Sequence, residues 1–189
     1  MNSSRASSSV ALLACVTSLA VTLAACGSVS ETAVAATVCP TAAPDSGGTP
    51  EWTLPGSTGS VEVTGSTDAA APSITVEAPF SVAETQVHTL QAGDGPVVAD
   101  TALASVCYMG VNGRDGSVFD SSYQRGAPVE FPLDGVVPGF QKAIAGQKVG
   151  STVAVAMTSA DGYPDGQPAA GIQPGDTLIF AIKILGASS

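Results

Sequence analysis

Apolar and polar positions alternate through the second half of the chain, and turn-forming residues break the alternation into segments that predict a β-sheet. The expected strands cover residues 74–76, 85–90, 102–111, 117–119, 149–157 and 177–185. In the third of these strands, alternation places Ala104, Val106 and Tyr108 on one face and Cys107 on the other. The turn residues at 112–116 predict a hairpin between the third and fourth strands.

One stretch has the spacing of a short amphipathic helix. Pro138 suits a first helical turn, Phe140, Ala143 and Ile144 share one face, and Gly146 can end the helix in the left-handed conformation. Five or six strands with a single short helix predict the α+β class. We expect a curled antiparallel sheet, a half-barrel, that wraps over the helix.

The first 26 residues have the pattern of an export signal. Arg5 precedes an apolar run over residues 10–25, which is shorter than the roughly 20 residues of a membrane span. The run ends in Leu-Ala-Ala-Cys, which resembles the lipobox of bacterial lipoproteins; an ordinary cleavage site with an incidental cysteine is the alternative. We expect a signal peptide at 1–25 and a lipid on Cys26. The lipid would anchor the exported protein to the outer face of a bacterial cell membrane.

Residues 26–73 are dominated by Ala, Thr, Ser, Gly and Pro. Such a composition buries too little apolar surface to offset the entropy lost on ordering, and it predicts a mostly flexible tether before a folded domain at 74–189. Two features leave docking of this tether open: Trp52 is its lone aromatic residue, and residues 60–64 alternate like a short strand.

Charge and ligand-forming residues narrow the function classes. The formal net charge is −10, and the six basic residues lie singly along the chain, so no cluster is available to bind the phosphates of a nucleic acid. His88 is the only histidine and no Cys-x-x-Cys pair exists, which leaves a zinc site without ligands. We expect no metal, no cofactor and no nucleic-acid partner, and we expect His88 to be an exposed strand residue.

Two cysteines of the exported part are not accounted for by the lipid. Export to an oxidising compartment allows Cys39 and Cys107 to form a disulfide, which would pin the tether across the convex side of the sheet.

Residues 116–140 hold four of the nine aromatic residues of the chain. Gly and Pro interrupt this stretch, which is typical of the wall of an apolar pocket. Asp120 directly follows Phe119, and an acid in an apolar wall costs free energy unless it has a partner or a task. Packing in an ordinary core is the alternative for Phe131, Phe180 and Val136.

An apolar pocket suits a reaction that needs no nucleophile. The chain has no Gly-x-Ser-x-Gly motif of the kind that carries a serine nucleophile. A pair of catalytic carboxylates remains an open alternative. The peptide bond before proline rotates slowly because amide resonance sets a barrier of about 18–20 kcal/mol. Water supports that charge-separated resonance. A dry aromatic pocket removes this support and thereby disfavours the planar ground state more than the twisted transition state.

Short motifs follow one another in a fixed order from Glu84 to Leu185. They are Gly93–Gly95, Tyr108–Gly110, Asp115–Ser122, Phe131–Leu133, Val136–Phe140, Val149–Gly150, Gly162–Tyr163, Ile172–Pro174 and Thr177–Phe180. In this order and at this spacing they resemble the FKBP-type peptidyl-prolyl isomerases, the macrolide-binding immunophilins, over essentially the whole folded part.

The resemblance implies a role for each matching residue. Phe140 would be the floor on which a proline ring stacks, at a position where the family usually has Trp. Tyr163 and the backbone N–H groups of Ile172 and Val137 would donate hydrogen bonds to ligand carbonyls, and Asp120 would accept one at the pocket edge. The walls would be formed by Tyr108, Phe119, Phe131, Val136, Val137 and Phe180. The expected catalytic residues are Tyr108, Phe119, Asp120 and Tyr163.

Besides Phe140, the chain departs from the family pattern at two further places. Pro164 follows Tyr163 where the family generally has Gly, and Thr158-Ser159 replaces a common proline pair.

The resemblance implies a monomeric rotamase that acts on proline-containing unfolded or exported polypeptides and that could take a macrolide ligand. The alternative is a slow or inactive peptide-binding module that serves as a chaperone or assembly contact. A purely structural surface lipoprotein is a third possibility.

Overall fold

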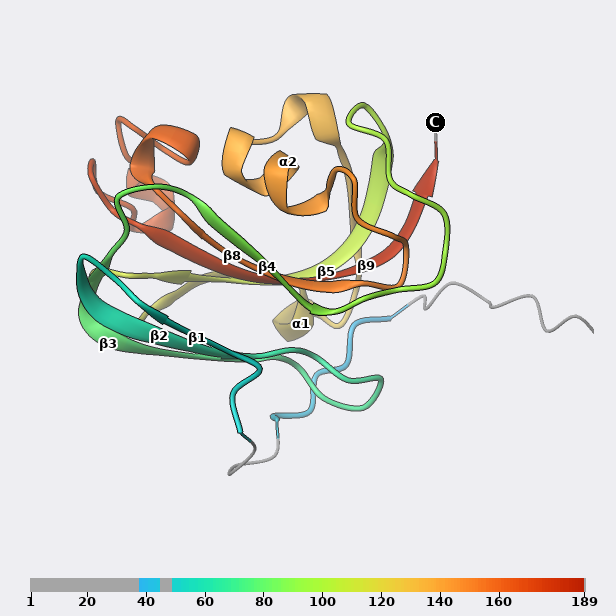
Figure 1. Ribbon diagram of the computed structural model, residues 1–189, viewed down its shortest axis with the longest axis horizontal. Coiled ribbons are helices and arrows are strands. Elements are labelled where there is room, and N and C mark those ends of the chain that lie inside the picture. The colour runs from blue at the N-terminus through green and yellow to red at the C-terminus, as the bar shows by residue number, and fades with distance from the viewer. Residues whose placement is uncertain (1–37, 45–48, 189) are drawn as a thin grey trace, which may run out of the picture. The chain divides into compact units, whose positions relative to one another are not determined.

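The computed structural model describes residues 38–44 and 49–188, which all fall in one compact unit (Figure 1). The signal peptide, the lipid site at Cys26 and the first part of the expected tether lie outside the described residues. The strands are β1 Trp52–Pro55, β2 Thr58–Thr64, β3 Ser73–Ser81, β4 Gln86–Gln91, β5 Leu103–Asn112, β6 Val118–Ser121, β7 Val129–Pro132, β8 Thr152–Met157 and β9 Leu178–Ser188. The α-helices are α1 Ser122–Arg125 and α2 Pro138–Ile144, and short 3-10 helices cover Leu133–Gly135, Ser159–Asp161 and Pro168–Ala170. None of the helices in the described ranges is both long enough and apolar enough to cross a membrane.

Six strands form the main antiparallel sheet, in which β9 is central. The order is β4-β8-β9-β5-β6, and β7 also pairs with β5. Figure 1 shows this sheet curling beneath α2, and the buried core between sheet and helix contains Val106, Ile144 and Ile182. The expected α+β fold, with a curled antiparallel sheet over a short helix, is confirmed. The expected faces of β5 are also confirmed, because Ala104, Val106 and Tyr108 lie in this core and Cys107 lies in a separate cluster on the other side.

Two elements next to the pocket were not expected from the pattern. Helix α1 is a single turn that Ser121 caps through a hydrogen bond from the Gln124 N–H, and Gly126 ends it in the left-handed region at φ 69°. Strand β7 has four residues and ends in Pro132. Both elements are too short to show a periodicity, so the sequence pattern gives no signal for them.

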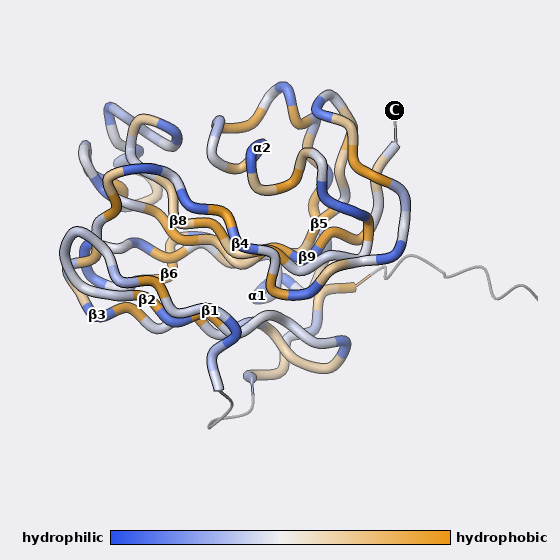
Figure 2. The backbone as a smooth tube through the Cα atoms, in the orientation of Figure 1, coloured by the Kyte–Doolittle hydropathy of each residue, from blue (hydrophilic) through white to orange (hydrophobic). Residues whose placement is uncertain are grey.

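A second sheet, β1-β2-β3, packs on the outer face of the main sheet. Val61 and Val63 of β2 are fully buried there against Ala154, Ala181 and Ile179 of β8 and β9. The prediction of a mostly flexible tether therefore does not hold for β1 and β2, and the docking left open for residues 60–64 is observed in β2. Local composition could not reveal that β8 and β9 offer small residues on which two valines can pack. Figure 2 shows the alternation of hydrophobic and hydrophilic residues along β1 and β2 that this packing uses.

Trp52 and His88 join the two sheets at one edge. Their rings stack with centroids 5.6 Å apart and planes inclined by 7°. The open question of Trp52 docking is thus answered within the described residues: Trp52 packs on β4, and His88 is an exposed strand residue as expected.

A disulfide between Cys39 and Cys107 fixes the N-terminal segment to the outer face of β5, with the two Cα atoms 5.7 Å apart. Tyr123 of α1 packs in the same buried cluster and donates a hydrogen bond to Ser66 at 2.8 Å. One of the four aromatics of the 116–140 stretch therefore faces away from the pocket. The cause is the turn of α1, which points Tyr123 to the side opposite Phe119.

Candidate functional site

An open pocket of about 380 Å³ lies on the concave side of the main sheet. Its lining residues are Tyr108, Phe119, Asp120, Phe131, Gly135, Val136, Val137, Phe140, Tyr163 and Phe180. The structure thus brings together all of the residues expected to contact substrate except Ile172, and it adds Gly135. The lining comes from four strands of the sheet (β5, β6, β7 and β9), from the segment 135–137 and the first turn of α2, and from the long β8–β9 loop at 158–177.

Phe140 forms the floor. Its ring meets Phe180, Phe131 and Tyr108 edge-on, with centroids 5.3, 5.6 and 5.8 Å away. Edge-to-face contacts of this kind hold the orientation of the Phe140 ring, which also lines the pocket. Gly139 lets the helix come this close to the sheet, because a Cβ at that position would lie 2.8 Å from Met157 of β8.

The wall on the β6 side depends on a glycine. Phe119 packs edge-on against Phe180, with centroids 5.5 Å apart. Gly110 of β5 lies beneath both rings, and a Cβ there would approach Phe119 to 2.6 Å and Phe180 to 2.8 Å. The absence of a side chain at Gly110 is what allows the two rings to meet at the bottom of this wall.

Asp120 lies at the pocket edge and has two partners. The Tyr108 hydroxyl donates to one carboxylate oxygen, and Arg125 donates to the other at 2.5 Å. Arg125 also donates to the Tyr108 hydroxyl oxygen at 3.1 Å. The side chain of Asp120 is 40% exposed, so it is a partnered acid at the rim rather than one enclosed in the wall. Sequence reasoning missed Arg125, whose only signal is its position one turn after Asp120, at the end of α1.

The contacts among Tyr108, Asp120 and Arg125 determine the protonation states of Tyr108 and Asp120. Burial of the ring, and then the hydrogen bond to Asp120, raise the pKa of Tyr108 to about 12. Burial by itself would raise the pKa of Asp120, but the hydrogen bonds from Tyr108 and Arg125 outweigh it and hold that pKa below its ordinary value. At neutral pH Tyr108 is therefore a neutral donor and Asp120 a carboxylate. The arrangement orients the Tyr108 ring and offers no proton-transfer group to a substrate.

Two of the expected hydrogen-bond donors face the pocket. Tyr163 comes from the β8–β9 loop, and Val137 immediately precedes α2. Within residues 38–44 and 49–188, neither the Tyr163 hydroxyl nor the Val137 N–H has a hydrogen-bond partner. Both can therefore donate to a ligand carbonyl.

The N–H of Ile172, which was expected to donate to a ligand, is used within the loop in this structure. Its N–H donates to the Gln167 carbonyl at 3.1 Å, while the Gln167 N–H donates to the Ile172 carbonyl at 2.9 Å. Its side chain is buried in the core and does not line the pocket. The reason is local: Gly171 adopts a left-handed conformation at φ 72° after the 3-10 turn Pro168–Ala170, and this closes the loop on itself.

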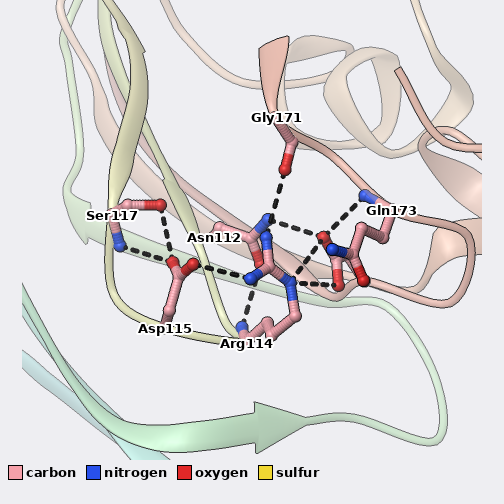
Figure 3. A network of polar contacts seen from close by, with 7 residues as sticks. Asn112, Arg114, Asp115, Ser117, Gly171 and Gln173 are labelled. Atoms are coloured by element: carbon pink, nitrogen blue, oxygen red, sulfur yellow. Dashed lines mark hydrogen bonds and ion pairs between the residues drawn. The ribbon is translucent and has the colours of Figure 1, made fainter. Parts of the chain in front are cut away.

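A polar network holds the far end of the loop that carries Tyr163 (Figure 3). The buried carboxylate of Asp176 accepts hydrogen bonds from Asn112 at 2.6 Å, from the Gln173 N–H at 2.8 Å and from Arg114 at 3.2 Å. Arg114 also donates to the Gly171 carbonyl at 3.1 Å. The network ties the loop to the β5–β6 hairpin, and it was not expected from the sequence because its members lie about 60 residues apart.

The site has no ligand set for a metal ion. Across the described ranges, no three His, Cys, Asp or Glu side chains are grouped so that they could hold one.

Comparison with known proteins gives the same family throughout. Residues 95–185 match the model of the family described as FKBP-type peptidyl-prolyl cis-trans isomerase. The chain is 37% identical over 100 residues to the FKBP-type 22 kDa peptidyl-prolyl cis-trans isomerase of Escherichia coli K12. This alignment covers 53% of this chain and 48% of that protein. It is 34% identical over 106 residues to the FK506-binding protein of Streptomyces anulatus, which covers 54% of this chain and 86% of that protein.

A solved structure is also similar. The crystal structure of FkpA from Escherichia coli superposes with a TM-score of 0.52 at 33% sequence identity, covering 55% of this chain and 48% of that one. The chain thus spans about half, or less, of the length of the Escherichia coli relatives, but most of the Streptomyces anulatus protein. On these grounds, the chain belongs to the FKBP-type peptidyl-prolyl cis-trans isomerase family.

Proposed function

We propose that the protein is a peptidyl-prolyl cis-trans isomerase that binds an X-Pro segment of a polypeptide in the aromatic pocket. One observation carries the proposal: Phe140 presents an apolar floor enclosed by aromatic walls, and two donors without a partner in the part of the chain that the structure describes lie at its rim. The proline ring would stack on Phe140. The Tyr163 hydroxyl and the Val137 N–H would hold carbonyl groups on either side of the ring.

The pocket would catalyse rotation by desolvation and orientation. The planar imide depends on charge separation between its oxygen and nitrogen, and water stabilises that separation. Between Phe119, Phe131 and Phe180 the imide exchanges water for apolar ring surface, which raises the free energy of the planar state more than that of the twisted state. Each roughly 1.4 kcal/mol of this difference gives about a tenfold acceleration.

Tyr108 and Asp120 would act by holding the shape of the pocket. Their hydrogen bond, together with Arg125, keeps the Tyr108 ring against Phe140 and Phe131. No covalent step or proton transfer is needed, and the carboxylate in the pocket lining, Asp120, is engaged by Tyr108 and Arg125.

We also propose that the protein is exported and works as a monomer on unfolded or newly exported polypeptides, anchored by a lipid on Cys26. The disulfide between Cys39 and Cys107 supports an oxidising compartment. Incorporation of labelled palmitate into the full chain, and its loss in Cys26→Ser, would test the anchor. Equal labelling of the two forms would contradict it.

A macrolide is a further proposed ligand, because the apolar volume and the two rim donors suit a cyclic acyl-proline analogue. Its binding would compete with that of a proline peptide. Binding of the two ligands at once would contradict a shared site.

A protease-coupled assay on a proline-containing peptide tests the enzyme against the alternative of a peptide-binding module. The full chain is expected to accelerate isomerisation, and Phe119→Ala and Asp120→Val are expected to lower kcat/KM. If the chain binds unfolded polypeptides but leaves the uncatalysed rate unchanged, the alternative is correct.

A further inference from the structure

Asp161 stands two residues before Tyr163, at the start of the β8–β9 loop, and its carboxylate joins three elements. The Thr85 hydroxyl, from the connection between β3 and β4, donates to Asp161 Oδ2 at 2.5 Å. Lys142 Nζ, on α2, donates to the same oxygen at 2.7 Å. Resting on the proposed function, we infer that Asp161 is a positioning residue that sets the distance between the Tyr163 hydroxyl and the Phe140 floor.

The sequence offsets make this link short. Lys142 follows Phe140 by two residues on α2, and Tyr163 follows Asp161 by two residues. The ion pair therefore connects the element that forms the floor with the element that carries the rim donor. No other hydrogen bond or ion pair within residues 38–44 and 49–188 joins a side chain of α2 to this loop.

The chain between Asp161 and Tyr163 transmits position because it is tightly turned. The Asp161 N–H donates to the Thr158 carbonyl at 3.1 Å, and the Gly162 N–H donates to the Ser159 carbonyl at 3.1 Å. Thr85 braces the same turn a second time, since its hydroxyl oxygen accepts from the Thr158 N–H at 3.3 Å. We therefore expect a movement of the Asp161 carboxylate to move Tyr163 as well, because the hydrogen-bonded turn keeps the backbone here from adjusting independently.

The two ends of the loop differ in how firmly they are held. The far end is fixed by the buried Asp176 network (Figure 3). The near end depends on Asp161, whose side chain is 23% exposed, and on Lys142, which is 55% exposed. Losing the near contact should leave the fold intact and free mainly the segment that carries Tyr163.

Asp161→Asn and Lys142→Met test the inference in the same isomerase assay. Asn keeps an oxygen for Thr85 and loses the charge that Lys142 binds, and Met keeps the apolar stem of Lys142. Because a rim donor holds substrate and transition state alike, each variant is expected to raise KM by roughly three- to tenfold with little change in kcat. The double variant is expected to match the single ones, since all three lack the same contact.

Asp165→Asn is the matched control. It removes the same charge from the same loop, two residues beyond Tyr163, at an exposed side chain with no hydrogen bond to the described residues. It is expected to leave KM unchanged. The inference is overturned if Asp161→Asn keeps the KM of the unmodified chain, or if Asp165→Asn raises KM equally.

Amide hydrogen exchange separates this inference from the proposed function. Exchange over residues 159–166 is expected to quicken in Asp161→Asn and to stay unchanged in Asp165→Asn. If the unmodified chain does not accelerate isomerisation, the proposed function is wrong, and the exchange comparison alone then decides whether Asp161 positions the loop. Unchanged exchange in Asp161→Asn would overturn the inference.

Discussion

Tyr108 belongs to both the aromatic floor and the polar rim. Its ring contacts Phe131, Phe140 and Phe180, while its hydroxyl lies between Asp120 and Arg125. Strand alternation placed Tyr108 on the same face as Ala104 and Val106, and the family resemblance implied that Tyr108 lines the pocket. Neither could supply Arg125, because the partner of a charged side chain depends on how the chain turns after β6.

The raised pKa of Tyr108 gives a prediction for alkaline solution. A group with a raised folded-state pKa contributes stability that is complete below its ordinary value of 10.0 and is lost as the pH rises through about 12. Tyr123 has a pKa raised to about 12 as well, through burial. Ultraviolet titration should therefore show a late step that shrinks in Tyr108→Phe and in Tyr123→Phe. A late step of unchanged size in Tyr108→Phe would contradict the assignment.

Arg125→Met tests the rim trio at acid pH. Arg125 helps to hold the pKa of Asp120 low, so the variant should raise that pKa, as measured by carbon NMR of the Asp120 carboxyl. A lowered folded-state pKa stabilises the protein above the ordinary value of 3.8 and loses this effect as the pH falls through the folded value. The variant should therefore lose less stability on acidification than the unmodified chain does. An unchanged Asp120 pKa in Arg125→Met would contradict the contact between Arg125 and Asp120.

The elements differ in how far the sequence determines them. Strand β5 and helix α2 have clear periodicity and were predicted, whereas β7 and α1 are only four residues long and carry none. The β8–β9 loop likewise contains one residue whose position was predicted, Tyr163, and one whose backbone contacts were not, Ile172. Tyr163 reaches the pocket as expected, but the backbone of Ile172 is used inside the loop, which only the left-handed turn at Gly171 explains.

Gly110→Ala tests the close packing of β5, β6 and β9 beneath the pocket. The added methyl group would press on Phe119 and Phe180, so the free energy of unfolding should fall by about 1–3 kcal/mol and kcat/KM should fall with it. Gly186→Ala is the matched control, because Gly186 lies in β9 with nothing within 4 Å of an added Cβ. Its effect should stay within about 0.5 kcal/mol. Equal losses in the two variants would contradict the role given to Gly110.

Across the whole molecule, the N-terminal part covers the side of the sheet that the pocket does not use. The small sheet packs on β8 and β9, and the segment at 38–44 is joined to β5 by the disulfide. The family match begins only at residue 95, and the composition predicted a tether. Alternation alone predicted residues 74–76 of β3 and left residues 60–64 of β2 open, so β1 and the packing of this sheet were not predicted. They depend on a surface that forms only when the main sheet has folded.

Removal of the disulfide tests how much the N-terminal segment contributes. The bridge closes a sequence separation of 68 residues, and Cys39→Ser with Cys107→Ser should lower the free energy of unfolding by about 2–5 kcal/mol in denaturant titration. Isomerase activity should persist, because the pocket lies on the opposite face. Free thiols counted in the denatured, unmodified chain should rise on reduction. Equal counts with and without reductant would contradict the bridge.

Two-dimensional NMR exchange spectroscopy of a proline peptide measures the central claim most directly, because it reads the cis–trans rate at equilibrium without a coupling protease. Catalytic amounts of the full chain should raise the exchange rate well above that of the peptide alone, and Phe140→Ala should abolish most of the increase. An exchange rate that stays at the uncatalysed value with the unmodified chain, at concentrations where the peptide is bound, would contradict the account.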